Sequence, residues 1–248
     1  RLDNLILVEP KVTQWYKEHY GKGICFPIIK TEEKARKEYE RVLPMNKETI
    51  EQYNLKGKKV FLFVGRLVAL KNVETAIQAF SHLNQKENVF VVVGDGPERE
   101  NLETLAKDLK ANVLFTGRLE GDALNVWYNI ADVFVLASYQ EPFGAVTNEA
   151  LLAGCYALVS NKAGSACLVE DGVNGYTFSP MNIEELTKKM DKISALISTE
   201  ENVGLKKNMM QISDESVILA MVNEVLDANP KAIEDIKNGR TNLVGFLV

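Results

Sequence analysis

Short apolar runs alternate with helical segments over most of this chain, and this alternation constrains the fold more than any other feature. Runs rich in Val, Phe and Leu are typical of buried strands, and N-terminal helix signals such as Asn72 and Pro97 follow them. Repeated alternation predicts an α/β fold, a doubly wound parallel sheet with helices on both faces. The expected strands are residues 60–64, 89–93, 112–116, 133–137, 156–160 and 176–178. The expected helices are residues 72–83, with Asn72 as N-cap, 97–109, 122–130, 182–197 and one that opens near Gly144.

The stretch from Tyr139 to Gly154 carries groups suited to ligand binding. It follows an expected strand and opens a helix at about Gly144, whose first turn offers free backbone N–H groups and a positive dipole end. Such loops are where open α/β sheets bind ligands. Free amides suit a diphosphate, and Glu141 and Glu149 suit hydroxyl groups on either side of it, because an ionised carboxylate only accepts hydrogen bonds. A sugar nucleotide contains all of these groups.

Glu-Pro-Phe-Gly at 141–144, followed by Asn-Glu-Ala at 148–150, resembles the signature of family 4 retaining glycosyltransferases. Two further stretches have the family's order and spacing, Gly65 to Lys71 and Gly94 to Pro97. The resemblance spans about residues 60–178 and implies the Rossmann-like C-terminal half, the donor-binding domain, of a two-Rossmann enzyme of polysaccharide or glycoconjugate biosynthesis. Because Gly94 to Pro97 lacks the Gly-x-Gly-x-x-Gly spacing of dinucleotide sites, we interpret it as a tight strand-to-helix turn.

The resemblance assigns three catalytic residues. Arg66 and Lys71 would grip the donor diphosphate and stabilise the leaving nucleotide, and Glu141 would address hydroxyls of the donor sugar. Lys71 is informative on its own. A cation at a helix N-terminus opposes the helix dipole and destabilises the protein by about 0.3–1 kcal/mol, unless a bound anion contacts both the cation and the helix end. Glu149 would accept hydrogen bonds from ribose hydroxyls. The other donor-binding residues would be Phe143, Gly144, Ala145 and Val146 through backbone amides, and Arg118 and Leu119 beside the base, where a plain turn is the competing interpretation.

The same resemblance divides the chain. Residues 1–30 are interpreted as a remnant of the N-terminal acceptor domain, which is otherwise missing. Residues 31–57 would form a helical linker, in which Pro44 breaks one helix from the next. Residues 58–205 would be the nucleotide-sugar-binding domain. Residues 206–248 resemble the helical tail of the tRNA-dependent amidotransferase B subunit, which indicates a natural or engineered fusion. The alternative is that any pair of amphipathic helices can resemble this tail.

Composition limits the partners. The net charge of −5 argues against general nucleic-acid binding. Three cysteines without metal-ligand spacing favour a reduced, cytoplasmic compartment. No apolar run approaches the ~20 residues of a membrane span, although an enzyme with membrane-linked acceptors could dock peripherally at the inner face. The resemblance implies a nucleotide-diphosphate sugar as substrate, with a UDP-sugar expected, and no metal or other cofactor.

We therefore expect transfer of a glycosyl group from a nucleotide-diphosphate sugar to an acceptor, with retention of configuration. Without the acceptor domain the chain is expected to be inactive alone. Two alternatives stay open. A nucleotide-sugar epimerase shares the architecture but needs acid–base residues in the cleft, and the only histidines, His19 and His82, are not clustered. A non-enzymatic interaction module with a tRNA-contacting tail is opposed by the acidic net charge.

Overall fold

The computed structural model describes residues 32–197 without a gap, and Ile6, Leu7, Gln14, Lys17, Glu18, His19, Ile24, Cys25 and Lys30 before them. Residues 1–199 form one compact unit and residues 200–248 a second. The expected tail at 206–248 and the end of the expected donor domain lie outside the described residues. Strands β1 (Ile6–Leu7) and β2 (Ile24–Cys25) pair in parallel as a separate two-stranded sheet.

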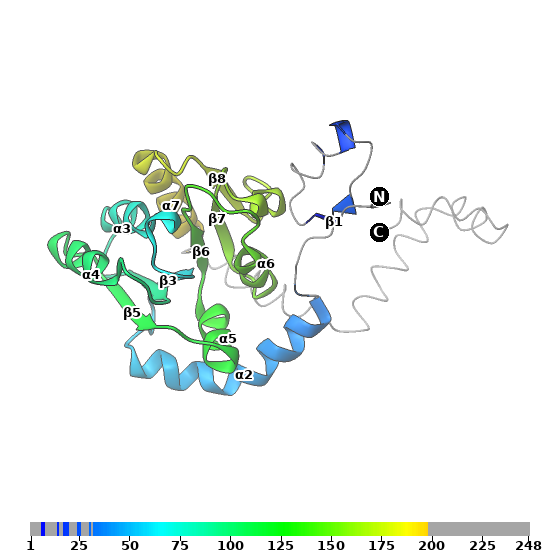
Figure 1. Ribbon diagram of the computed structural model, residues 1–248. Coiled ribbons are helices and arrows are strands. Elements are labelled where there is room, and N and C mark those ends of the chain that lie inside the picture. Colours follow the sequence, from blue (N-terminus) through cyan, green and yellow to red (C-terminus); the bar gives the residue numbers. More distant parts are fainter. Residues whose placement is uncertain are drawn as a thin grey trace. The chain divides into compact units, whose positions relative to one another are not determined.

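A six-stranded parallel sheet forms the centre of the domain (Figure 1). Its spatial order is β5-β4-β3-β6-β7-β8, so the chain moves outward from β3 to one edge and then from β6 to the other. The strands are β3 (Lys59–Val64), β4 (Asn88–Val93), β5 (Val113–Gly117), β6 (Val133–Leu136), β7 (Tyr156–Ser160) and β8 (Gly175–Phe178). The predicted doubly wound parallel sheet is confirmed, and the central strands are apolar runs buried on both faces, as is typical of parallel sheets.

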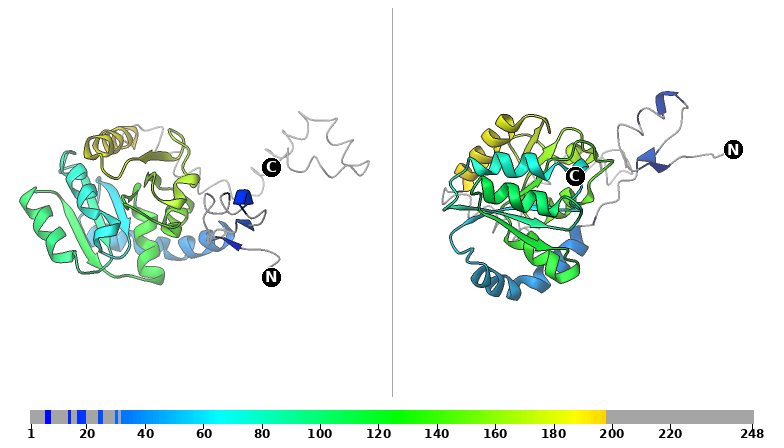
Figure 2. Two further views of the ribbon diagram at one scale, coloured as in Figure 1. Left: turned by 45° about the horizontal axis from the view of Figure 1, so that its top comes forward. Right: turned by 60° about the vertical axis from the view of Figure 1, so that its left-hand side comes forward.

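Helices cover both faces of this sheet (Figures 1 and 2). Helices α3, α4 and α7 pack together on one face, and α2, α5 and α6 on the other. Between sheet and helices the Phe80 ring packs against Phe61 and Phe90, with centroids 5.4 and 5.5 Å away. The helices are α2 (Glu32–Gln52), α3 (Val73–Ser81), α4 (Arg99–Asp108), α5 (Gly121–Ile130), α6 (Ala145–Leu152) and α7 (Ile183–Ile197), with short 3₁₀ turns η1 (Ala69–Lys71) and η2 (Gly164–Leu168).

The predicted helix break at Pro44 is wrong, because α2 continues through this residue. Proline removes one backbone donor and normally disrupts a helix interior. Here packing against α5 outweighs that local effect. Tyr39 and Val42 are buried, and the Tyr39 carbonyl accepts a hydrogen bond of 2.8 Å from the Asn129 side chain on α5. Tertiary contacts therefore set the length of this helix.

The loops after β3, β4 and β5 lie against one another through glycine. The Gly94 amide donates to the Gly117 carbonyl at 2.8 Å, and the Gly65 amide donates to the Val93 carbonyl at 3.0 Å. Gly94 has φ +155°, and a Cβ there would lie 1.8 Å from the Gly65 oxygen. A Cβ on Gly96 would lie 2.3 Å from the Leu67 oxygen. Only residues without a side chain allow this close backbone approach.

We expect Pro44→Ala to raise the free energy of unfolding by about 2 kcal/mol, because alanine restores a helix donor and removes the ring clash. Urea unfolding followed by circular dichroism measures the change. Lys47→Ala, at an exposed position on the same helix, is the control and should shift stability by less than about 0.5 kcal/mol. A loss of stability in Pro44→Ala would contradict this account of α2.

We expect Gly94→Ala to cost about 2–4 kcal/mol of stability, because it combines positive-φ strain with a collision against the Gly65 backbone. Gly57→Ala is the matched control, since Gly57 also has a positive φ, +74°, but nothing lies within 4 Å of the point that its Cβ would occupy. Its cost should be only about 1 kcal/mol. Equal losses of stability for Gly94→Ala and Gly57→Ala in denaturant titrations would show that the close backbone approach does not require glycine at position 94.

Candidate functional site

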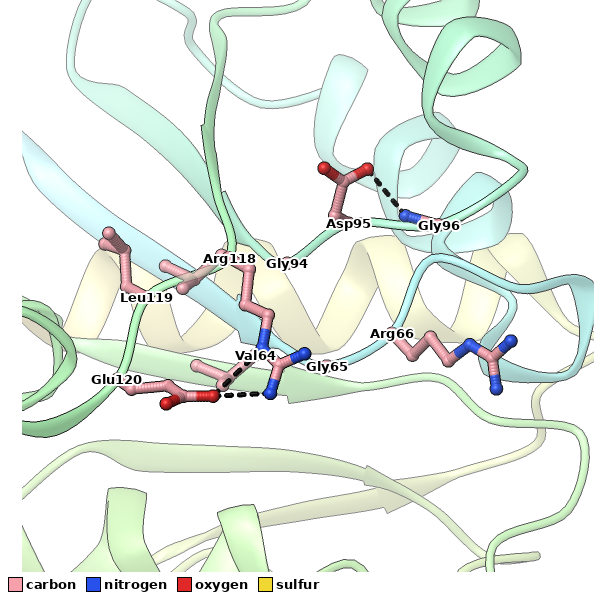
Figure 3. Close-up of a pocket in the computed structure, with 10 residues that line it drawn as sticks. Val64, Gly65, Arg66, Gly94, Asp95, Gly96, Arg118, Leu119 and Glu120 are labelled. Atoms are coloured by element: carbon pink, nitrogen blue, oxygen red, sulfur yellow. Dashed lines mark hydrogen bonds and ion pairs between the residues drawn. The ribbon is translucent and has the colours of Figure 1, made fainter.

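A cavity of about 640 Å³ opens beyond the carboxyl ends of β3, β4 and β5 (Figure 3). Pockets of this size are typical of small-molecule sites, and the carboxyl edge is where parallel sheets place them. The three glycine-linked loops build its floor. The lining residues are Val64, Gly65, Arg66, Val93, Gly94, Asp95, Gly96, Arg118, Leu119 and Glu120.

The charged residues of the cavity differ in their partners. Arg118 donates from Nε to Glu120 at 3.0 Å, and both side chains are exposed. The Asp95 carboxylate accepts the Gly96 amide at 2.7 Å. The exposed Arg66 guanidinium, in contrast, makes no ion pair with the described part of the chain, and Figure 3 shows it extending from the β3 loop away from Arg118. Arg66 is therefore the cation that is available to a ligand here.

At the same carboxyl edge of the sheet, an ion pair joins Lys71, after β3, to Glu141, after β6. Neither residue is among those that line the cavity. Both side chains are mostly shielded from solvent, with exposed fractions of 23% and 13%. The Tyr139 amide donates to the Leu70 carbonyl at 3.0 Å and ties the same two loops together. The structure thus brings two of the three predicted catalytic residues into contact.

Asn72 occupies the N-cap position of α3, but the expected side-chain cap is absent among the described residues. Its backbone has the left-handed conformation, with φ 52°. Its side-chain amide donates instead to the carbonyls of Ala137 and Pro180, at 3.1 and 2.9 Å. Asn72 therefore fixes the loops around Lys71 and leaves the first amides of α3 without a side-chain cap.

Helix α6 begins at Ala145, directly after Gly144. Gly144 has φ +87°, and a Cβ there would lie within about 3 Å of atoms of Leu136, Ser165 and Glu141. No described side chain caps this helix, so the amides of Ala145 and Val146 are available at its positive end. Phe143 is buried, and its carbonyl accepts the Ser165 amide at 2.7 Å.

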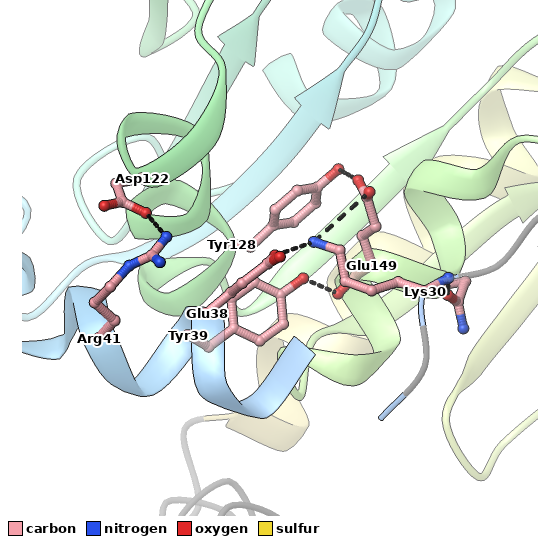
Figure 4. Close-up of polar contacts among 8 residues, drawn as sticks. Lys30, Glu38, Tyr39, Arg41, Asp122, Tyr128 and Glu149 are labelled. Atoms are coloured by element: carbon pink, nitrogen blue, oxygen red, sulfur yellow. Dashed lines mark hydrogen bonds and ion pairs between the residues drawn. The ribbon is translucent and has the colours of Figure 1, made fainter. Parts of the chain in front are cut away.

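Glu149 lies in a different polar group, between α2, α5 and α6 (Figure 4). Its carboxylate accepts a hydrogen bond of 2.9 Å from the Tyr128 hydroxyl and lies 3.8 Å from the Lys30 ammonium. It is not among the residues that line the cavity. The side chain keeps an exposed fraction of 26%, so it can still meet a ligand.

The structure divides the predicted site residues between the cavity, the Lys71–Glu141 ion pair with the start of α6, and the polar group around Glu149. Arg66, Arg118 and Leu119 line the cavity. Glu120 was not among the predicted site residues, and Gly94 to Pro97 was predicted only as a turn. The available signal was a Gly-Asp-Gly run directly after a buried strand.

Within residues 32–197 and the few described before them, no group of three or more His, Cys, Asp or Glu side chains is arranged to hold a metal ion. The helices in this part of the chain are too short or too polar to cross a membrane. Cys155 is buried and Cys167 is exposed.

Comparison with known proteins assigns most of this domain. The model of the family described as glycosyl transferases group 1 matches residues 45–209. An uncharacterized glycosyltransferase of Methanocaldococcus jannaschii is 36% identical over 139 residues, which cover 55% of this chain and 36% of the relative. Anabaena HepE, solved in complex with UDP and glucose, superposes with a TM-score of 0.69 at 19% identity, covering 91% of this chain and 63% of that structure.

The C-terminal part has a second similarity. The GatB domain model matches residues 180–248 and so overlaps the first match. The B subunit of the aspartyl/glutamyl-tRNA(Asn/Gln) amidotransferase of Bacillus velezensis is 38% identical over 86 residues, 35% of this chain and 17% of the relative. These matches support the resemblance of the tail.

The chain spans about a third of the length of the curated glycosyltransferase and just over three fifths of the solved structure. The family match nevertheless covers more than half of the chain and includes the cavity, the Lys71–Glu141 pair and the start of α6. By this match, the chain belongs to the glycosyl transferases group 1 family.

Proposed function

We propose that this domain binds a nucleotide-diphosphate sugar and serves as the donor-binding part of a family 4 retaining glycosyltransferase. The observation that carries the proposal is the position of the Lys71–Glu141 pair at the carboxyl edge of the sheet. Glu141 lies next to Gly144 at the uncapped start of α6, and Lys71 follows β3 in the same loop as Arg66, which lines the cavity. Cations, free amides and a carboxylate in one region match the diphosphate and the sugar hydroxyls of such a donor.

The diphosphate would be held by Arg66, Lys71 and the first amides of α6. The pairing of Lys71 with Glu141 does not exhaust the ammonium, because it has three donors and one carboxylate contact uses only one. Glu141 in turn keeps further lone pairs for sugar hydroxyls. One ion pair can therefore present a cation to the phosphates and a carboxylate to the sugar.

The nucleoside would occupy the neighbouring groups. The base would lie in the cavity against the loop of Gly94 to Gly96, and Arg118 and Leu119 border it. Glu149 would accept hydrogen bonds from the ribose hydroxyls. Anabaena HepE, which has a similar fold, was solved with UDP and glucose, and we propose a UDP-sugar as the donor here.

In the proposed reaction the bond between the sugar C1 and the diphosphate oxygen breaks, and its electron pair leaves with the nucleotide. The acceptor hydroxyl forms its bond to C1 on the same face and passes its proton to the departing phosphate oxygen. Arg66 and Lys71 would stabilise the negative charge that develops on the diphosphate.

The acceptor would be bound by a part of the enzyme outside residues 58–205. We propose that the chain alone transfers little or no sugar, and that residues 206–248 are a fused segment related to the amidotransferase tail. The match of the GatB domain model supports the second point. No metal is required in this proposal, since the cations named above supply the positive charge.

Calorimetry with UDP, GDP and ADP tests the proposal on the full chain. We expect weak binding of one of them, UDP first, and no change on adding a chelator. Lys71→Met and Arg66→Met should each weaken binding about tenfold or more, because charged hydrogen bonds contribute about 1.5–3 kcal/mol.

Lys188→Met is the matched control, since Lys188 is an exposed cation paired with Glu184 on α7. Its affinity should equal that of the wild type. A folded sample that releases no heat with any of the three nucleotides would rule out the site.

A further inference from the structure

We propose that Tyr128 and Lys30 are positioning residues that hold the Glu149 carboxylate ready for the ribose hydroxyls of the nucleotide. This inference rests on the proposed function and deepens it. It assigns a role to a polar group that comes from three helices, α2, α5 and α6, and from Lys30 before α2 (Figure 4).

Tyr128 fixes the side chain of Glu149. The Tyr128 ring is completely buried on α5, and its hydroxyl donates to Glu149 Oε2 at 2.9 Å. Burial, together with the negative charge of Glu149, raises the pKa of Tyr128 well above its ordinary value. The phenol therefore stays protonated and acts only as a donor toward this carboxylate.

Tyr39 fixes the backbone at the same position. Its hydroxyl, on the buried face of α2, donates to the Glu149 carbonyl at 2.8 Å. Burial and the charge of Glu149 also raise the pKa of Tyr39. The main chain and the side chain of Glu149 are thus held by two different helices.

Lys30 supplies the positive charge of the group. Its ammonium lies 2.9 Å from Glu38 Oε2, 3.8 Å from Glu149 Oε1 and 5.3 Å from the centre of the Tyr39 ring. Its backbone amide donates to the Asn148 side chain at 2.9 Å, one residue before Glu149. Only 14% of the Lys30 side chain is exposed, which is low for a lysine. Lys30 therefore places one positive charge beside two neighbouring carboxylates, Glu38 and Glu149.

This arrangement leaves Glu149 able to bind. A carboxylate has about four acceptor positions, and Tyr128 occupies one of them. The remaining positions can accept two hydroxyl groups from a ribose. Because the carboxylate is already ordered, binding does not cost the side-chain entropy that a free glutamate would lose.

The test compares each nucleotide diphosphate with its dideoxyribose analogue, which lacks both ribose hydroxyls. Calorimetry on the full chain uses UDP first, or whichever of UDP, GDP and ADP the wild type binds. We expect the wild type to bind the ribose form more tightly. Tyr128→Phe should weaken binding of the ribose form about tenfold and leave the dideoxy form unchanged. Lys30→Met should act in the same direction, and Glu149→Gln should remove most of the preference for ribose.

Arg41→Met is the matched control. Arg41 pairs with Asp122 and so links the same two helices, α2 and α5, but both side chains are exposed and neither contacts Glu149. This variant should bind both nucleotide forms as the wild type does. Thermal unfolding without ligand checks that every variant is folded.

Three outcomes overturn the positioning role while leaving the nucleotide site intact. They are unchanged binding of UDP by Tyr128→Phe, an equal loss for the ribose and dideoxy forms, and a wild type that does not distinguish the two forms. A wild type that binds none of the three nucleotides would instead defeat the proposed function itself. The two failures are therefore distinguishable.

Discussion

The pairing of β3 with β6 is the contact on which the rest of the domain depends. These strands are neighbours in the sheet, with Phe61 beside Val133 and Leu62 beside Phe134, although two strand–helix units separate them in the chain. The strand order reverses at this pair, so the chain leaves β3 for one face of the sheet and β6 for the other. Diverging connections open a crevice at the carboxyl edge of a parallel sheet. Lys71 and Glu141 face each other across this divergence.

Electrostatics at this edge follow from the same topology. Two helices, α3 and α6, begin beside the reversal without a side-chain cap from the described residues, and the first turn of α6 contains no acidic residue, whereas that of α3 contains Glu74. Glu141 compensates one cation, Lys71, while Arg66 stays exposed at the cavity. The edge is therefore locally suited to an anion, although the chain as a whole has a net charge of −5.

Much of the sheet could be predicted from the sequence, because near-continuous apolar runs such as Val60–Val64 suit strands buried on both faces. The continuity of α2 through Pro44 could not, since it depends on burial against α5 rather than on local preference. Lys71 and Glu141 were assigned to one site by the family resemblance, and in the structure they form an ion pair. The partners of Glu149 were not predictable, because Tyr128 and Lys30 approach it only after three helices have packed.

The backbone contacts between the loops after β3, β4 and β5 have a consequence for diversification. The backbone of Gly94 packs closely against that of Gly65, and Gly96 against Leu67, so these loops form one tightly packed unit. A longer or bulkier segment in any one of them would have to displace the other two. New ligand preferences at this edge are therefore more easily acquired by exchanging the side chains at 66, 118, 119 and 120 than by changing loop length.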